Sequence, residues 1–208
     1  MDNKQHWETV YQTKLADQVS WYRPHLETSL AWIGQAVGRD AAVIDVGGGE
    51  STLVDDLLDA GYRSLSVLDI SQAAIDATRA RLGDRAAKVD WVVGDITQVA
   101  LPARRFDVWH DRAVFHFLTD PVQRAAYVDR LLAALKPGGQ AIIATFGPDG
   151  PQQCSGLAVV RYDVDALLAT LGARFTLRQH TLDQHRTPWG STQQFLYGRF
   201  RVEPSTHA

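Results

Sequence analysis

The stretch VIDVGGGES, residues 43–51, joins a short apolar run to three consecutive glycines, and a helical pattern of apolar residues follows it directly. This order is typical of a strand, a tight turn and a helix. Glycine is favoured where the backbone needs an unusual conformation or where a ligand lies against the chain. The first N–H groups of a helix lack partners inside it and favour an anionic group. Gly47, Gly48 and Gly49 therefore predict a site for a nucleotide-like ligand, with an ordinary glycine-rich loop as the alternative.

Composition limits the classes of protein to which the chain can belong. Its 208 residues suit one domain with an adequate core, so we expect residues 1–208 to form a single domain. The 21 Lys and Arg residues do not exceed the 24 Asp and Glu residues, which leaves no basic field for nucleic acid. The single cysteine, Cys154, excludes an intrachain disulfide framework and fits a reducing compartment. No apolar run reaches the ~20 residues of a membrane span, so we expect a cytoplasmic protein without nucleic-acid or membrane partners, as a monomer or homodimer.

Residues 1–38 are rich in aromatic side chains. Trp7 and Tyr11 fall at helical spacing, Trp21 and Tyr22 follow in a predicted bend, and a second amphipathic helix comes after them. We predict a helical lid whose rings cover a ligand at the mouth of a sheet. The alternative is a helix that packs its aromatic rings on the edge of the sheet.

The rest of the chain predicts an α/β fold. Five short apolar strands alternate with helical segments, which implies parallel strands with right-handed crossovers. These strands are residues 42–46, 64–69, 89–93, 106–111 and 140–145. Two long extended segments, 175–183 and 194–202, follow and most simply pair antiparallel. We therefore expect a doubly wound, mostly parallel sheet of seven strands with an antiparallel last strand, divided into a cofactor-binding half, 40–145, and an acceptor-side segment with a C-terminal hairpin, 146–208.

Acidic residues end the second and third predicted strands. Asp69 lies 22 residues after Gly47 and could accept hydrogen bonds from both hydroxyls of a ribose held on the glycine turn. The alternative, that Asp69 caps the next helix, is less favoured because Ser71 already suits that position. Asp95 could reach the exocyclic amine of an adenine and Ile96 could flank its ring, unless Asp95 is a simple turn residue.

Asp111 and His116 follow the fourth predicted strand and are the first groups in the chain able to manage a proton. Ligands of an open parallel sheet bind outside the carboxyl ends of its strands. We therefore predict Asp111 and His116 as catalytic residues. The alternatives are that Asp111 pairs with Arg112 or caps a turn, and that His116 is a hydrogen-bonded histidine of the core.

Taken in order, these motifs resemble those of the class I S-adenosylmethionine-dependent methyltransferases, over roughly residues 40–202. The glycine stretch resembles the family's first motif, Asp69 stands at its acidic ribose position, and residues 94–96 look like its adenine-contacting motif. Residues 135–139 match its turn before the fifth strand. Ser51 departs from the pattern, because a third glycine is usual there.

The resemblance implies a cofactor, S-adenosylmethionine, that leaves as S-adenosylhomocysteine. Its methyl group already sits on a sulfonium, so neither a metal nor a covalent intermediate is needed. The resemblance and the lid together predict these cofactor-binding residues: Asp45, Gly47, Gly48, Gly49, Asp69, Ile70, Asp95, Ile96 and Asp111, with Tyr11 and Trp21 from the lid. A nicotinamide-dependent oxidoreductase and a non-catalytic binder of the cofactor are the alternatives.

The methyl acceptor is less well indicated. Residues 109–113 look like the corresponding stretch of thiopurine and thiol methyltransferases, whereas residues 6–11 resemble small methyltransferases, some of which modify lysines in proteins. We expect a small-molecule acceptor with a sulfur, oxygen or nitrogen nucleophile, and a protein lysine as the alternative. The predicted substrate-binding residues are Trp7, Tyr22, Arg112, Cys154, Arg161, His185 and Trp189.

Overall fold

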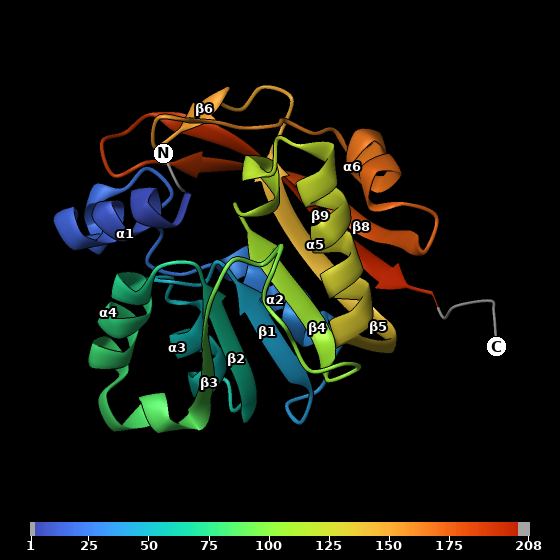
Figure 1. Cartoon of the computed structure of the whole chain (residues 1–208), viewed down its shortest axis with the longest axis horizontal. Coiled ribbons are helices and arrows are strands. Elements are labelled where there is room, and N and C mark those ends of the chain that lie inside the picture. Colours follow the sequence, from blue (N-terminus) through green and yellow to red (C-terminus); the bar gives the residue numbers. More distant parts are fainter. Residues whose placement is uncertain (1–2, 204–208) are drawn as a thin grey trace.

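The computed structural model describes residues 3–203 and contains one large sheet between two layers of helices (Figure 1). The α-helices are α1 (Asn3–Thr13), α2 (Glu27–Ala36), α3 (Leu53–Asp59), α4 (Gln72–Leu82), α5 (Pro121–Ala134) and α6 (Val164–Leu171). The strands are β1 (Ala42–Val46), β2 (Ser64–Asp69), β3 (Val89–Val93), β4 (Phe106–Arg112), β5 (Leu135–Phe146), β6 (Gln153–Cys154), β7 (Leu157–Ala158), β8 (Phe175–Arg186) and β9 (Thr192–Val202). Short 3₁₀ helices are η1 (Ala16–Gln18), η2 (Gly83–Lys88) and η3 (Phe115–Phe117).

The large sheet has the order β3-β2-β1-β4-β5-β9-β8. Strands β1 to β5 pair in parallel, and β9 pairs antiparallel with both β5 and β8. This confirms the predicted seven-stranded, mostly parallel sheet with a reversed last strand. One difference lies in the predicted connection after β5, which contains the two-stranded sheet β6–β7.

Three helices begin where the sequence places a capping side chain. The Ser71 hydroxyl accepts a hydrogen bond from the Ala74 N–H at the start of α4. Asp120 accepts from Val122 N–H before α5, and Asp163 accepts from Ala166 N–H before α6. These side chains satisfy N–H groups that have no partner within the helix. Because Ser71 caps α4, the Asp69 carboxylate is available for another role.

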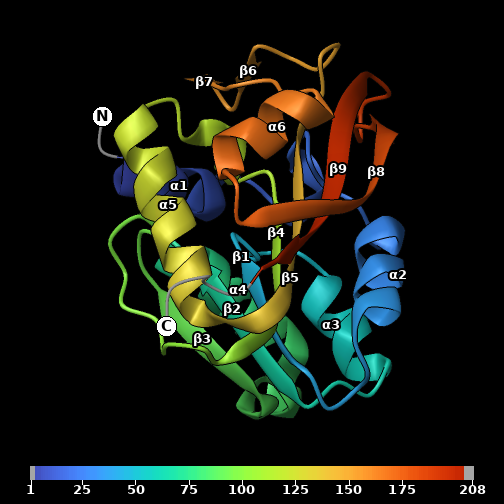
Figure 2. The same cartoon turned by 90° about the vertical axis from the view of Figure 1, so that its right-hand side faces the viewer.

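The helices cover both faces of the sheet, as a doubly wound fold requires. Buried apolar residues of α2, α3 and α4 share one core with β1 and β2. Buried residues of α5 and α6 form a second core with β4, β5 and β9 on the opposite face. Figure 2 shows α5 and α6 on one side of the sheet and α2 and α3 on the other.

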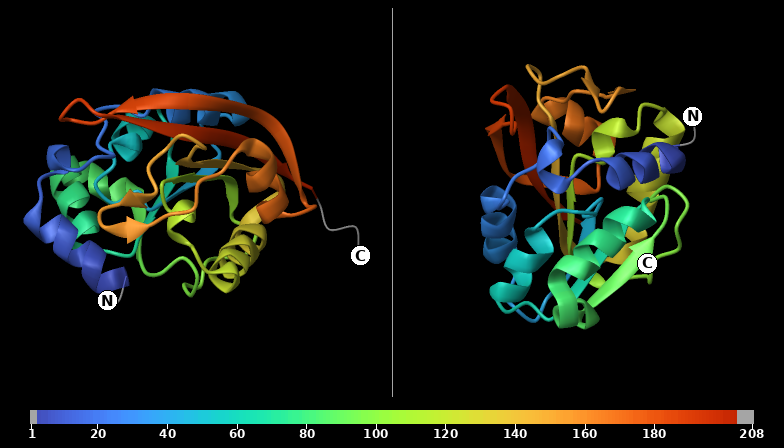
Figure 3. Two further views of the ribbon diagram at one scale, coloured as in Figure 1. Left: turned by 90° about the horizontal axis from the view of Figure 1, so that it is seen from above. Right: turned by 90° about the vertical axis from the view of Figure 1, so that its left-hand side faces the viewer.

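Helix α1 belongs to neither of these layers. It lies across the carboxyl ends of the parallel strands, directly above α4, and the β6–β7 hairpin lies over the same end of the sheet (Figure 3). Among residues 3–203, no helix is long and apolar enough to cross a membrane. Helix α1 therefore covers the carboxyl edge of the sheet.

Candidate active site

The turn after β1 has no room for side chains. Gly47 has a φ of +72°, and a Cβ atom there would collide with Val114. A Cβ atom on Gly48 would lie 2.5 Å from the Asp45 carboxylate, and one on Gly49 would lie 2.6 Å from the Asp69 carboxylate. These distances are too short for non-bonded atoms, so all three glycines are required by the packing of the turn.

Asp69 ends β2 directly beside this turn. Its carboxylate accepts hydrogen bonds from the N–H of Gly49 at 3.1 Å and from the N–H of Ser71 at 2.9 Å. Burial raises the pKa of Asp69 to about 7, although the two hydrogen bonds act in the opposite direction. The direction of the Asp69 carboxylate is therefore fixed, and its pKa lies close to neutral pH.

A first cavity of about 860 Å³ opens at the carboxyl ends of β1, β2 and β3. Asp95 follows β3 and lines the cavity, and its Oδ1 accepts hydrogen bonds from the N–H and hydroxyl of Thr97. The predicted site residues that line this cavity are Trp7, Tyr11, Trp21, Gly47, Asp69, Ile70, Asp95, Ile96, Arg112 and Cys154.

A second cavity of about 530 Å³ lies on the other side of the glycine turn. It shares Tyr11, Trp21, Gly47 and Arg112 with the first cavity, so the two adjoin. Its remaining lining includes further predicted residues, namely Tyr22, Asp45 and Gly48. Together the two cavities border the glycine turn.

Arg112 ends β4 where the two cavities meet. Its Nε donates to the Tyr197 hydroxyl at 3.1 Å, its Nη1 donates to the Trp21 carbonyl at 3.0 Å, and its guanidinium lies 4.5 Å from the centroid of the Phe195 ring. The remaining nitrogen, Nη2, is buried and has no hydrogen-bond partner among the described residues. The side chain is therefore held on three sides with one donor group unused.

Glu50 lines the second cavity, and its carboxylate is opposite in charge to the Arg112 guanidinium. Its Oε2 is buried and, within residues 3–203, has no hydrogen-bond partner. Burial raises the pKa of Glu50, and the charge of Arg81 only partly opposes this rise. Buried polar groups without partners are rare and call for an explanation. An unused carboxylate oxygen and an unused guanidinium nitrogen in one cavity suit the ammonium and carboxylate groups of an amino acid.

Beneath the glycine turn, Asp45 belongs to a buried chain of side chains. His110 Nδ1 lies 2.7 Å from Asp45 Oδ1, and His110 Nε2 lies 2.9 Å from the Ser29 hydroxyl. All three residues are buried. These hydrogen bonds connect β1 and β4 to α2. They also fix the Asp45 carboxylate, which lies close to Gly48.

Aromatic rings from α1 and from the following segment form a roof. Trp7 contacts Trp21 and Phe117 edge to face, with centroid distances of 5.6 and 5.0 Å. Tyr11 contacts Trp21 in the same way at 6.5 Å. All four rings line the first cavity. The sequence singled out Trp7, Tyr11 and Trp21, and the structure adds Phe117.

His116 lies outside the residues that line the two cavities. It is fully buried, its Nδ1 accepts a hydrogen bond from the Phe146 N–H at 3.1 Å, and its ring packs on Phe117 and Phe146. Burial, helped by the charge of Arg112, lowers the pKa of His116 to about 3. These are the surroundings of a neutral histidine in the core, but the alternative of a hydrogen-bonded core histidine is met only at Nδ1, because the buried Nε2 has no partner within residues 3–203.

Asp111 is likewise enclosed and does not line either cavity. Its carboxylate accepts hydrogen bonds from the N–H groups of Val114 and Phe115 and from the Tyr127 hydroxyl at 2.6 Å. Burial raises the pKa of Asp111 to about 6, against these hydrogen bonds. This geometry matches the alternative that Asp111 caps a turn. Asp111 makes no ion pair with Arg112.

The other predicted substrate-binding residues are dispersed. Arg161 donates to the carbonyls of Pro148 and Gly150, and Trp189 is 62% exposed. His185 is buried and its Nε2 donates to the Ser20 carbonyl at 2.7 Å. None of these three lines either cavity. Cys154 does, but burial raises the pKa of its thiol to about 11, so it is a poor nucleophile there.

Three features of the site were not singled out from the sequence. Glu50 stands beside the glycines without a pattern of its own, although its position in the motif could have suggested a role. Phe117 and Gln123 line the first cavity from the region between β4 and α5. Their participation depends on the path of this connection, which the sequence does not specify.

Comparisons with known proteins agree with this geometry. Residues 43–139 match the family described as a methyltransferase domain. A curated relative from Bos taurus, the eEF1A lysine and N-terminal methyltransferase, is 29% identical over 141 residues, which are 65% of this chain and 20% of that protein. The chain thus spans about a fifth of the length of this relative.

Solved structures share the fold over nearly the whole chain. A protein studied in the conversion of a disulfide bond into a thioacetal group during echinomycin biosynthesis superimposes with a TM-score of 0.78, at 20% identity, over 96% of this chain and 93% of its own. The 1,6-didemethyltoxoflavin-N1-methyltransferase of Burkholderia thailandensis, solved with S-adenosylhomocysteine, has a TM-score of 0.70 at 21% identity, over 97% and 87% of the two chains. Residues 43–139 thus match a methyltransferase domain, and the sheet order and the solved structures show that the chain has the class I S-adenosylmethionine-dependent methyltransferase fold.

Proposed function

We propose that this methyltransferase acts on a small-molecule acceptor enclosed in the first cavity and methylates a sulfur, oxygen or nitrogen atom. The observation that supports this proposal is the aromatic roof. Trp7, Tyr11, Trp21 and Phe117 cover the strand ends, and α1 lies over them. An acceptor beneath such a roof is surrounded by rings, whereas a protein side chain is best served by an open face.

The described residues fit S-adenosylmethionine along the two cavities. Asp69 would accept hydrogen bonds from the ribose hydroxyls, and Asp95, Ile70 and Ile96 would surround the adenine. In the second cavity, Arg112 Nη2 would donate to the carboxylate of the methionyl part and Glu50 Oε2 would accept from its ammonium. This assignment gives a ligand partner to Arg112 Nη2 and Glu50 Oε2, two of the buried atoms that lack one within residues 3–203.

The chemistry needs little more than positioning. When bound, S-adenosylmethionine supplies a methyl group on a sulfonium, a leaving group that departs as a neutral thioether. The chain has to hold the acceptor in line with this group and to exclude water, and good orientation can lower a barrier by up to ~7–11 kcal/mol. Since Asp111 and His116 are enclosed, we assign them to holding the β4–α5 region and propose that the acceptor arrives with its nucleophile already deprotonated.

The proposal includes the division of the chain. Of the predicted lid, residues 1–38, only the part up to Leu26 lines the cavities, because α2 packs on the sheet with α3. Within a single domain, residues 40–145 bind the cofactor, and the acceptor-side segment contributes Cys154 to the first cavity. A cytoplasmic location without nucleic-acid partners rests on the composition given above, with one cysteine and no basic excess.

A lysine of a protein is the second candidate acceptor, because a relative at 29% identity carries that activity in its name. Transfer of labelled methyl from S-adenosylmethionine into a cell extract, separated into protein and small-molecule fractions, distinguishes the two. We expect the label in the small-molecule fraction. Label confined to protein would contradict a small-molecule acceptor, and the modified side chain would then be identified by mass spectrometry.

A further inference from the structure

Helix α1 carries two rings of the roof, Trp7 and Tyr11, yet little apolar packing holds it in place. Within Asn3–Thr13, only Val10 is buried. The ring contacts of Trp7 and Tyr11 are made with Trp21 and Phe117, which line the cavity themselves. The position of the roof therefore depends on polar contacts that α1 makes elsewhere.

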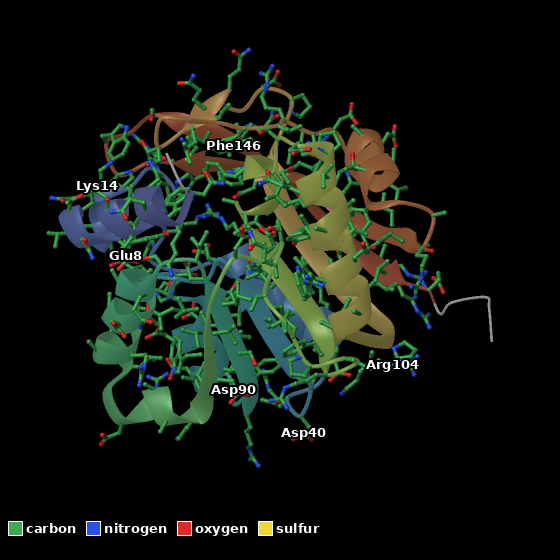
Figure 4. The ribbon with its side chains drawn as sticks, viewed as in Figure 1. Glu8, Lys14, Asp40, Asp90, Arg104 and Phe146 are labelled. Atoms are coloured by element: carbon green, nitrogen blue, oxygen red, sulfur yellow. The ribbon has the colours of Figure 1, made fainter. Side chains whose placement is uncertain are left out.

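Such a contact is made by Glu8, on the side of α1 that faces α4. Its Oε2 accepts a hydrogen bond from the Ser71 hydroxyl at 2.8 Å, and its Oε1 accepts from the Ala73 N–H at 3.2 Å. Ser71 is the N-cap of α4 and Ala73 lies in its first turn. A carboxylate is favoured at this end of a helix, where unpaired N–H groups and the helix dipole both attract negative charge. Figure 4 shows Glu8 between α1 and the upper end of α4.

The protonation of Glu8 agrees with this contact. Burial alone would raise the pKa of Glu8, but hydrogen bonds from Ser71 and Ala73 outweigh it and hold that pKa below its usual value. Gln12, one turn later on α1, donates a further hydrogen bond to Oε1 at 3.2 Å. Glu8 is therefore charged and oriented at neutral pH.

The contact between Glu8 and Ser71 is also connected to Asp69, which lines the first cavity. The N–H of Ser71 donates to the Asp69 carboxylate at 2.9 Å, while the hydroxyl of Ser71 donates to Glu8. One residue thus joins the lid helix to the carboxylate assigned to the ribose. Movement of α1 away from α4 would break the Glu8 contact and displace Trp7 and Tyr11 from the cavity together.

We propose that Glu8 is a positioning residue that latches α1 onto the first turn of α4 and thereby limits the rate at which the cofactor leaves. The inference rests on the proposed function, because it requires the cofactor to lie beneath the roof. Trp7 and Tyr11 cover that space, so exit of the cofactor requires α1 to move.

The test is a chase experiment with labelled S-adenosylhomocysteine on the full chain. Glu8→Ala removes the two hydrogen bonds that join α1 to α4, Glu8→Gln keeps an acceptor oxygen but loses the charge, and Thr9→Ala is the matched control on the same helix. We expect dissociation at least tenfold faster in Glu8→Ala, because the loss of one of its two charge-assisted hydrogen bonds to α4 would already give about that factor. Glu8→Gln should be intermediate, and Thr9→Ala should match the unmodified protein.

Thermal unfolding separates this role from a general structural one. The unfolding midpoint of Glu8→Ala should fall by no more than about 4 °C. The lost contact is partly exposed, and its contribution is small compared with the free energy of unfolding of the whole domain. A fall in the midpoint with an unchanged dissociation rate would overturn the latch while leaving the cofactor site intact. Failure of the unmodified protein to bind S-adenosylhomocysteine would overturn the proposed function and the latch with it.

Discussion

Asp69 provides the sharpest test of the cofactor site. Its carboxylate is fixed by the N–H groups of Gly49 and Ser71 and lies in the wall of the first cavity. If it accepts hydrogen bonds from both ribose hydroxyls, Asp69→Ala removes two hydrogen bonds to a charged group. At the low end of ~1.5 kcal/mol each, the loss is about 3 kcal/mol, or roughly a hundredfold in affinity.

Asp69→Asn refines this estimate, because the amide keeps the shape of the side chain and one acceptor oxygen. Its affinity should lie between that of Asp69→Ala and that of the unmodified protein. Isothermal titration with S-adenosylhomocysteine measures all three, and Asp76→Asn, an exposed aspartate on α4, is the control. Unchanged affinity in a folded Asp69→Ala variant would remove the ribose from this position and refute the assignment of the cavity.

The raised pKa of Asp69 adds a dependence on pH with a definite sign. In the free protein this pKa is about 7. Ribose hydroxyls donate to the charged form, so the bound cofactor lowers the pKa, and affinity should rise as the pH increases from about 6 to about 8. The stability of the free protein should respond oppositely: burial of the charge costs free energy, so the contribution of Asp69 falls as the pH rises from its unfolded pKa of about 4 towards 7. Asp69→Asn should show neither effect.

Three further predictions concern β4 and the residues after it. Arg112→Lys should weaken S-adenosylhomocysteine about tenfold in calorimetry but leave binding of its decarboxylated analogue unchanged, because only the former has a carboxylate for Nη2. Asp111→Asn should lower the free energy of unfolding by about 1–3 kcal/mol, since it disturbs three hydrogen bonds, and should leave kcat within about twofold. His116→Gln should likewise lower the unfolding midpoint with little change in kcat. A large loss of kcat in either variant at full stability would restore the proton-transfer role expected from the sequence.

Most of the sheet could be predicted because its signals are local. The bounds of β1, β2 and β3 agree with the prediction, since each strand is a short apolar run between polar or glycine-rich segments. Strand β5 is longer than predicted and begins at Leu135. Leu135 pairs with Phe106 across an irregular register, so residues that resemble a turn in the sequence continue the strand. Pairing with a distant strand overrides the local pattern there.

The lid could be predicted as a helix with a row of aromatic residues, but its attachment could not. Glu8 and Ser71 are 63 residues apart, and no pattern in the sequence links the first helix to the cap of α4. The same holds for Arg112 and Tyr197, which meet only because β9 lies beside β5. Contacts of this kind depend on how the elements are placed in space, and periodicity carries no information about that placement.

The residues at the end of β4 show why residue type and topology together were insufficient. Consecutive side chains of a strand point to opposite faces. Trp109 and Asp111 point towards α5, where both bind Tyr127. His110 and Arg112 point the other way, towards Ser29 and Trp21, where the cavities open. The rule that ligands bind at the carboxyl ends of strands predicts which end of the sheet holds the site, but it does not predict which side chains of β4 line it. A difference of one residue therefore exchanges a buried capping carboxylate for a cavity-lining guanidinium.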